Sequence, residues 1–258
     1  MTRIALALFA TLAIAVVVAA SWFVLERGSP GRLGDVSMVR SLPAFSQIVI
    51  DGAADVTLVQ GSAHGIAIEA SGRQPPRLRA EVVGDTLTIT AEDSRRWWSW
   101  LLGGGGRTPR LTVTFRELNG LRASGAVKIR TDALRSETFS VGISGAASLI
   151  FSGLDLDQLS VSGSGAVKTE LAGRATQQKI SVSGAADYRA ANLRSDRASV
   201  AVSGAGRVVV NAAKALQVDI SGAGLVEYLG SPELKQAVSG AGRVRRRDAG
   251  FETGHRVA

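Results

Sequence analysis

The chain has 258 residues, a formal net charge of +8, 30 glycines and no cysteine. The absence of cysteine excludes disulfides, thiolate catalysis and cysteine-ligated zinc or iron–sulfur sites. With only two histidines, little material remains for a histidine-centred metal site or a Ser-His-Asp triad. We therefore expect no cofactor, no bound metal and no catalytic residues, and the glycine content favours strands joined by tight turns over a helical bundle.

The N-terminus predicts export. An uncharged run of 22 residues extends from Ile4 to Leu25, which as a helix is long enough to span a bilayer. Its length favours a membrane anchor, whereas Val18-Ala19-Ala20 resembles a signal-peptide cleavage site. Residues 1–25 are thus expected to be a hydrophobic helix that acts as a signal peptide or an inner-membrane anchor. The polar, Gly- and Pro-containing residues 26–40 are expected to be a linker to a periplasmic or cell-envelope domain.

A short repeat dominates the remainder of the chain. The triplet Ser-Gly-Ala occurs seven times at intervals of 18–20 residues, and Asp51-Gly52-Ala53 is an earlier variant. The seven copies begin at Ser124, Ser144, Ser164, Ser183, Ser203, Ser221 and Ser239. This regularity makes the repeat the primary signal for the fold.

The residues around each triplet predict strands. In Val200–Val210, "VAVSGAGRVVV", apolar residues alternate with small or polar ones, which is typical of strands with one buried face. A repeat of 18–20 residues is too short for a βαβ unit or a propeller blade. It fits one coil of an all-β parallel solenoid in which stacked coils share a core. Leu134, Leu154 and Leu193 are expected to point inward from a second side of the coil.

Each triplet is interpreted as a structural corner. A phosphate-binding loop would open a helix, but the triplets are followed by strand-like segments and lack a Gly-Lys-Ser/Thr ending. In a stack, we expect the serine hydroxyls to form a ladder, the glycine to adopt dihedral angles that other residues avoid, and the alanine to pack under the bend. The predicted corner glycines are Gly125, Gly145, Gly165, Gly184, Gly204, Gly222 and Gly240.

Several segments together resemble a known family. They are "FSQIVIDGAADVTLVQG" (Phe45–Gly61), "GDTLTIT" (Gly84–Thr90), "LTVTFRELNGLRASGAVKI" (Leu111–Ile129) and the triplets that follow. Over about Phe45 to Arg243 the chain resembles the auto-transporter adhesin head GIN domain family. The resemblance implies a right-handed parallel β-helix outside the cytoplasm, here assigned to residues 41–245, with a polar tail over 246–258. It supplies no catalytic residues.

One segment departs from the family pattern. The insert Ser94–Pro109, "SRRWWSWLLGGGGRTP", separates two strand candidates and holds three of the four tryptophans. Because tryptophan is enriched at membrane interfaces and binding hot spots, one interpretation is a loop that contacts lipid, glycan or a partner protein. The other is that the rings fold back and cover the apolar interior. The candidate contact residues are Arg95, Arg96, Trp97, Trp98 and Trp100.

The predicted function is non-catalytic: adhesion, binding or scaffolding in the cell envelope through the flat faces or the Trp-rich loop. Its partner would be an envelope protein, a glycan or a membrane surface, and self-association through exposed strands is a further option. The alternative is a β-helix protein that binds or cleaves polysaccharide. Candidate acids for that alternative are Asp155, Asp157, Asp187, Asp196 and Asp219. The basic run Arg243–Arg247 is interpreted as a solvated, charged end and not as a nucleic-acid site, since export disfavours that partner.

Overall fold

A computed structural model describes residues 35–71, 78–91 and 108–247. Only these residues are described below. Within the described ranges the chain forms strands and no helix, so the prediction of an all-β fold is confirmed. No helix in these ranges is long and apolar enough to cross a membrane. The predicted N-terminal hydrophobic helix lies outside the described residues.

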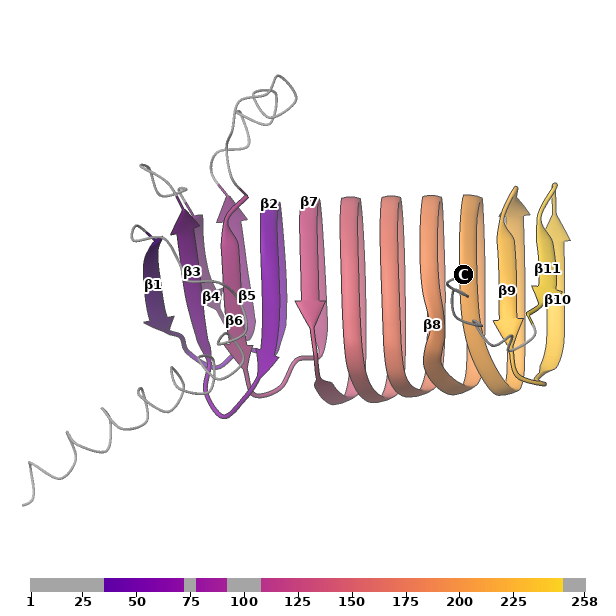
Figure 1. Cartoon of the computed structure of the whole chain (residues 1–258), viewed down its shortest axis with the longest axis horizontal. Coiled ribbons are helices and arrows are strands. Elements are labelled where there is room, and N and C mark those ends of the chain that lie inside the picture. The colour runs from indigo at the N-terminus through magenta and orange to yellow at the C-terminus, as the bar shows by residue number, and fades with distance from the viewer. Residues whose placement is uncertain (1–34, 72–77, 92–107, 248–258) are drawn as a thin grey trace, which may run out of the picture. The chain divides into compact units, whose positions relative to one another are not determined.

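The first strand that contains a corner with the strand segments on both sides of it is β2, Gln47–Gln60. Its first half pairs in parallel with β5 (Thr86–Ala91), and its second half pairs in parallel with β6 (Arg110–Phe115). On its other side residues 47–58 pair in parallel with β7 (Gly120–Thr131). The segments β5 and β6 thus occupy the positions of one coil that precedes β2 in the stack, although both follow β2 in the sequence (Figure 1).

Antiparallel strands close this end of the stack. The strand β3 (Gly65–Ser71) runs antiparallel to β6, and β4 (Leu78–Val83) runs antiparallel to β5. The remaining strand, β1 (Asp35–Ser41), lies next to β3. Because the chain reverses direction here, the outer edges of β5 and β6 are already paired.

From β7 onward the coils follow one another directly. The strand β8 is continuous over the 89 residues Leu134–Gly222 and winds through several coils (Figure 1). Its first coil pairs in parallel with β7 at a register of twenty residues, so that Gly145 lies beside Gly125. The repeat interval read from the sequence is therefore the pairing register of the sheet.

The end of the stack is assembled from short strands. The strands β9 (Leu225–Leu229) and β10 (Glu233–Ser239) both pair in parallel with β8, and β11 (Arg243–Arg246) pairs with β9. The sheet is open, since β1 lies at one end of its pairing order and β11 at the other.

Alternation of side chains builds a single core. Core residues occupy every second position before and after the corners, as in Val200, Val202, Val208 and Val210; Val209, between the last two, is also buried but lies outside the core cluster. This burial explains the period-two pattern, because successive side chains of a strand point to opposite faces. Leu134, Leu154 and Leu193 are buried as predicted, at 0%, 3% and 0% exposure.

Candidate binding surface

The seven corner glycines share one backbone conformation. Their φ angles lie between +101° and +123°, a region that side chains with a Cβ atom rarely adopt. Each lies against the corresponding glycine of the preceding coil, and a Cβ atom on Gly184 would lie 2.8 Å from the carbonyl oxygen of Gly165. The corner therefore needs glycine for two reasons, its φ angle and the close approach of neighbouring backbones.

The serines of the corners differ from expectation. Ser124 donates a hydrogen bond to Asp51 in the neighbouring coil, with an Oγ–Oδ1 distance of 2.7 Å. No hydrogen bond joins two corner serines in the described part of the chain, so the predicted serine ladder is wrong. The reason is distance: adjacent strands lie about 4.8 Å apart, whereas a hydroxyl bond needs less than about 3 Å, and only the longer aspartate side chain closes the gap.

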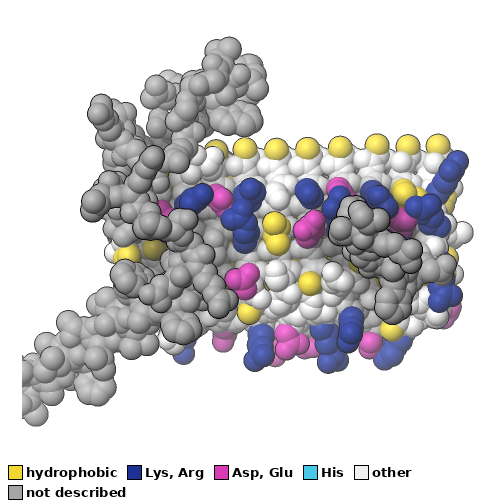
Figure 2. Space-filling model, viewed as in Figure 1, with side chains coloured by type: hydrophobic (Ala, Val, Ile, Leu, Met, Phe, Trp, Pro, Cys, Tyr) yellow, Lys and Arg dark blue, Asp and Glu magenta, His cyan; other side chains and the backbone are white. Residues whose placement is uncertain are grey.

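The corner alanines also differ from expectation, because they face solvent instead of packing under the bend. A row of hydrophobic side chains along one edge of the stack is visible in Figure 2. The small buried residue follows one position later, as in Val127, Ala147 and Ala186. Each corner thus presents one hydroxyl and one methyl group to solvent. The exposed alanines are Ala126, Ala146, Ala166, Ala185, Ala205, Ala223 and Ala241.

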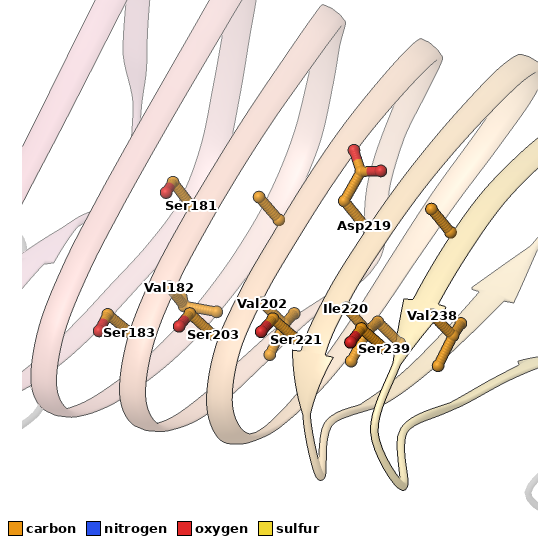
Figure 3. Close-up of a pocket in the computed structure, with 12 residues that line it drawn as sticks. Ser181, Val182, Ser183, Val202, Ser203, Asp219, Ile220, Ser221, Val238 and Ser239 are labelled. Atoms are coloured by element: carbon orange, nitrogen blue, oxygen red, sulfur yellow. The ribbon is translucent and has the colours of Figure 1, made fainter.

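A shallow hollow of about 390 Å³ lies beside the last four corners. Figure 3 shows Ser183, Ser203, Ser221 and Ser239 in a row, one on each successive coil. The other wall has one charged residue, Asp219, among small side chains. Val182, Val202, Ile220 and Val238 also line the hollow, so its surface is mostly apolar, with a row of serine hydroxyls and little charge.

The insert with the tryptophans replaces one corner. In the paired coils, Asp51 lies beside Thr90 and Asp55 lies beside Arg110. Three residues connect the two halves in β2, whereas nineteen residues, 91–109, connect them in the preceding coil. The insert thus connects Thr90 and Arg110 at the position where every later coil has its triplet. Its candidate contact residues Arg95, Arg96, Trp97, Trp98 and Trp100 lie outside the described residues.

The candidate acids are dispersed, and most have a basic or amide neighbour. Asp155 lies 3.8 Å from Arg135, Asp187 lies 2.7 Å from Arg189, and Asp196 lies 2.8 Å from Lys214. Gln217 donates a hydrogen bond to Asp219. A hydrogen bond from Lys214 holds the pKa of Asp196 below its ordinary range. No group of three potential metal ligands occurs among the described residues.

A buried carboxylate lies near the end of the stack. Glu227 in β9 is 3% exposed and accepts hydrogen bonds from Arg207 and Arg245. Burial acts to raise the pKa of Glu227, but the two guanidinium groups outweigh it and hold the pKa below its ordinary value. The arginines of the basic run are all exposed, but the run is not wholly a free charged end, because Arg245 donates hydrogen bonds to this carboxylate and Arg246 donates one to Ser231.

A second polar cluster lies inside the core and has no obvious sequence signal. Gln178 is 2% exposed and donates to the hydroxyl of Ser195 at 2.7 Å, and that hydroxyl donates to the backbone carbonyl of Asn211 at 2.6 Å. Tyr188, 1% exposed, lies with its hydroxyl 3.5 Å from the Gln178 carbonyl oxygen, and burial raises its pKa. Alignment of the coils would have revealed Gln178 as a polar residue in an apolar column. These buried groups bind one another, so the cluster is part of the core and not of a binding surface.

The family is shown by comparison with known proteins. Residues 44–232 match the family described as "putative auto-transporter adhesin, head GIN domain". Because this match covers most of the chain, the protein belongs to that family. Among curated proteins, nothing matches the chain.

Solved structures share the fold. A putative adhesin from Bacteroides fragilis superposes with a TM-score of 0.72 at 18% identity, covering 85% of this chain and all of that one. A putative lipid binding protein from Parabacteroides distasonis gives a TM-score of 0.66 at 18% identity, covering 84% and 98%. A putative adhesin from Parabacteroides merdae gives 0.62 at 18% identity, with the same coverage. At these identities the likeness concerns the fold.

Proposed function

We propose that this protein is a non-catalytic binding protein of the cell envelope, in which a right-handed β-solenoid holds a tryptophan-rich insert at one corner. Membership of an adhesin-like family supports a binding role. So does the pairing of the candidate acids with basic or amide groups, which suits a solvated surface more than a catalytic pair. Residues 1–25 would direct export as a leader or anchor, with 26–40 as tether, 41–245 as the binding domain and 246–258 as its tail.

The position of the insert carries the proposal. A corner needs three residues, yet nineteen are present between Thr90 and Arg110, although the strands on both sides keep their register with β2. The extra residues are therefore unnecessary for pairing. Arginine and tryptophan at the centre of such a segment are the residue types that dominate binding hot spots.

The register also supplies a sharp test. Replacing residues 91–109 with Gly-Ala-Ala copies the connection between Asp51 and Asp55, so the variant should retain its strand content and melting behaviour. We expect the full chain to capture a crosslinked envelope partner or to bind envelope membranes, and the corner-replacement variant to lose at least tenfold of that binding. Substitution of Trp97, Trp98 and Trp100 by alanine should reproduce the loss.

Tryptophan fluorescence separates contact from internal packing. The fourth tryptophan of the chain is Trp22, so in a Trp22→Phe background emission reports on the insert alone. A red emission maximum that shifts to the blue on addition of envelope membranes supports contact through the insert. A blue maximum in detergent alone, unchanged by membranes or glycans, together with full partner capture by the corner-replacement variant, would refute it.

A further inference from the structure

A polar groove crosses several coils on the side that leads into the corners. It has a volume of about 480 Å³. Its walls consist of outward side chains on either side of one column of buried residues. This column forms the floor and is apolar except for Gln178, whose side chain bonds into the core: Phe139, Leu159, Gln178, Ala198 and Leu216. We call it the amide groove and define it by Gln158, Ser160, Gln177, Lys179, Arg197 and Ser199.

On the strands that follow the corners, four arginines are paired across coils: Arg130 with Asp55, Arg189 with Glu170, and both Arg207 and Arg245 with Glu227. Two exposed lysines on these strands, Lys128 and Lys168, form no ion pair with a described residue, but they do not line the amide groove. Mixed basic and acidic side chains are visible on the face shown in Figure 2. The groove lining brings two such cations, Lys179 and Arg197, together with amide side chains, and neither cation forms an ion pair with a described residue.

The remaining charges of the groove cancel. Glu233 and Lys235 lie at its end and pair with each other at 3.6 Å. The lining therefore carries a net positive charge at Lys179 and Arg197, flanked by the amides of Gln158 and Gln177. Amides and hydroxyls exchange hydrogen bonds with sugar hydroxyls, whereas lysine and arginine pair with carboxylates.

We propose that the amide groove binds an acidic, uronate-bearing polysaccharide whose chain runs from coil to coil. Lys179 and Arg197 pair with its carboxylates, and Gln158 and Gln177 bind its hydroxyls. A stack repeats its side-chain positions about every 4.8 Å, a spacing comparable with the length of one sugar ring. A polymer can therefore make related contacts on successive coils, and linked contacts add avidity beyond that of any single one.

Other occupants fit the groove less well. Its apolar floor is buried under the walls, so it exposes little of the surface that a lipid chain or a second copy of the protein would need. This inference rests on the proposed binding role, but it concerns a site separate from the insert, so the two can fail independently.

The test uses the full chain in detergent with polygalacturonate as the probe. The groove variant is Lys179→Ser with Arg197→Gln, which places at each position a residue type that already occurs in the lining. The matched control is Lys128→Ser with Lys168→Ser, two exposed lysines that follow corners, because it removes the same net charge. Ser148 already occupies the corresponding position beside Lys128.

We expect the full chain to bind polygalacturonate in a salt-sensitive manner, the groove variant to bind at least tenfold more weakly, and the control to bind within twofold of the original. The corner-replacement variant should retain this binding. Equal losses in groove variant and control would overturn the proposal, as would absence of binding to polygalacturonate. Binding that occurs only to phosphatidylglycerol vesicles would also overturn it. Loss of polygalacturonate binding by the corner-replacement variant alone would place the glycan at the insert and overturn the groove.

Discussion

Two features of Gly184 exclude a side chain: its φ angle of +101°, which would be strained in other residues, and the backbone of Gly165, with which a Cβ atom would clash. We predict that Gly184→Val lowers the free energy of unfolding by about 2–4 kcal/mol, because it combines backbone strain with a steric clash. Gly142→Ala is the control, since Gly142 has an ordinary φ angle and a Cβ atom there would lie 3.6 Å from Ser162 Oγ. Urea melts measure both. A wild-type melt for Gly184→Val would refute this account of the corner.

We expect Glu227 to make the end of the stack less stable at acidic pH. Its pKa in the folded chain lies below the ordinary value of 4.5, so its contribution is present above pH 4.5 and is lost as the pH falls through the folded pKa. We predict that Glu227→Gln costs about 1–3 kcal/mol at pH 7, because it removes charge-assisted hydrogen bonds to two arginines. The stability difference between the variant and the original protein should shrink below pH 4.5.

An exposed pair provides the comparison for Glu227. Glu170 lies 3.4 Å from Arg189, with both side chains about half exposed. Glu170→Gln should change the free energy of unfolding by less than about 1 kcal/mol, as is usual for solvated ion pairs. If urea melts at pH 7 gave equal effects for Glu170→Gln and Glu227→Gln, burial of Glu227 would not be the cause.

At the scale of the elements, we expect the stability of β1 and β3 to depend on pH through His64. His64 precedes β3, accepts a hydrogen bond from the Leu42 amide through its backbone carbonyl and packs edge-on against Phe45 with ring centres 4.9 Å apart. Its Nδ1 atom is buried and has no hydrogen-bond partner among the described residues. Burial, followed by the charge of Arg116, lowers the pKa of His64 below 6.5.

The sign of the effect follows from this lowered pKa. Below pH 6.5 the unfolded chain binds a proton at His64, whereas the folded chain does so only at lower pH. The free energy of unfolding therefore decreases as the pH falls from 6.5 to the lower pKa of His64 in the folded chain. We predict that hydrogen exchange of β1 and β3 accelerates between about pH 7.5 and 5.5, after correction for the intrinsic exchange rate. In His64→Phe this acceleration should be absent. An unchanged pH response in that variant would assign it to another group.

The positions of the strands could be predicted from the sequence better than their direction of pairing. The interval between triplets predicted the pairing register, because a stack repeats only if equal positions align. The alternation around Val200–Val210 identified the core-facing valines correctly, but it did not predict that Val209, on the other side of the strand, is buried too. The antiparallel arrangement of β3 and β4 was not predicted, since strand polarity depends on distant pairing and leaves little trace in local composition. The position of the insert was accessible, because "DTLTIT" and "RLTVTF" align with the two halves of β2.

The residues of the candidate surfaces were harder to predict. Alternation assigns a side chain to the inside or the outside, but a triplet at a bend interrupts the alternation, and the corner alanines were therefore placed inside in error. Lys179 and Arg197 lie eighteen residues apart and meet in one groove only through the register of neighbouring coils. No local motif marks such a site.

For the whole molecule, stacking predicts tolerance to the loss of an entire coil. Deletion of residues 144–163 joins Ile143 to Ser164 and leaves every later corner in register. Because stability in stacked repeats is approximately a sum over units and their interfaces, this variant should remain folded with a reduced free energy of unfolding. Deletion of residues 144–153 breaks the register and should prevent cooperative folding. Circular dichroism and urea melts compare the two, and similar unfolding of both variants would argue against independent coils.

The corner that the insert replaces has a practical consequence. Two strands of one coil keep their pairing with β2 although the segment between them is six times longer than its neighbour's. The number of residues at this corner therefore does not affect the pairing of the strands on either side, whereas the later corners all have the same short connection. A foreign peptide grafted between Thr90 and Arg110 would be displayed from a scaffold whose register it does not control, which makes this corner a natural site for epitope presentation.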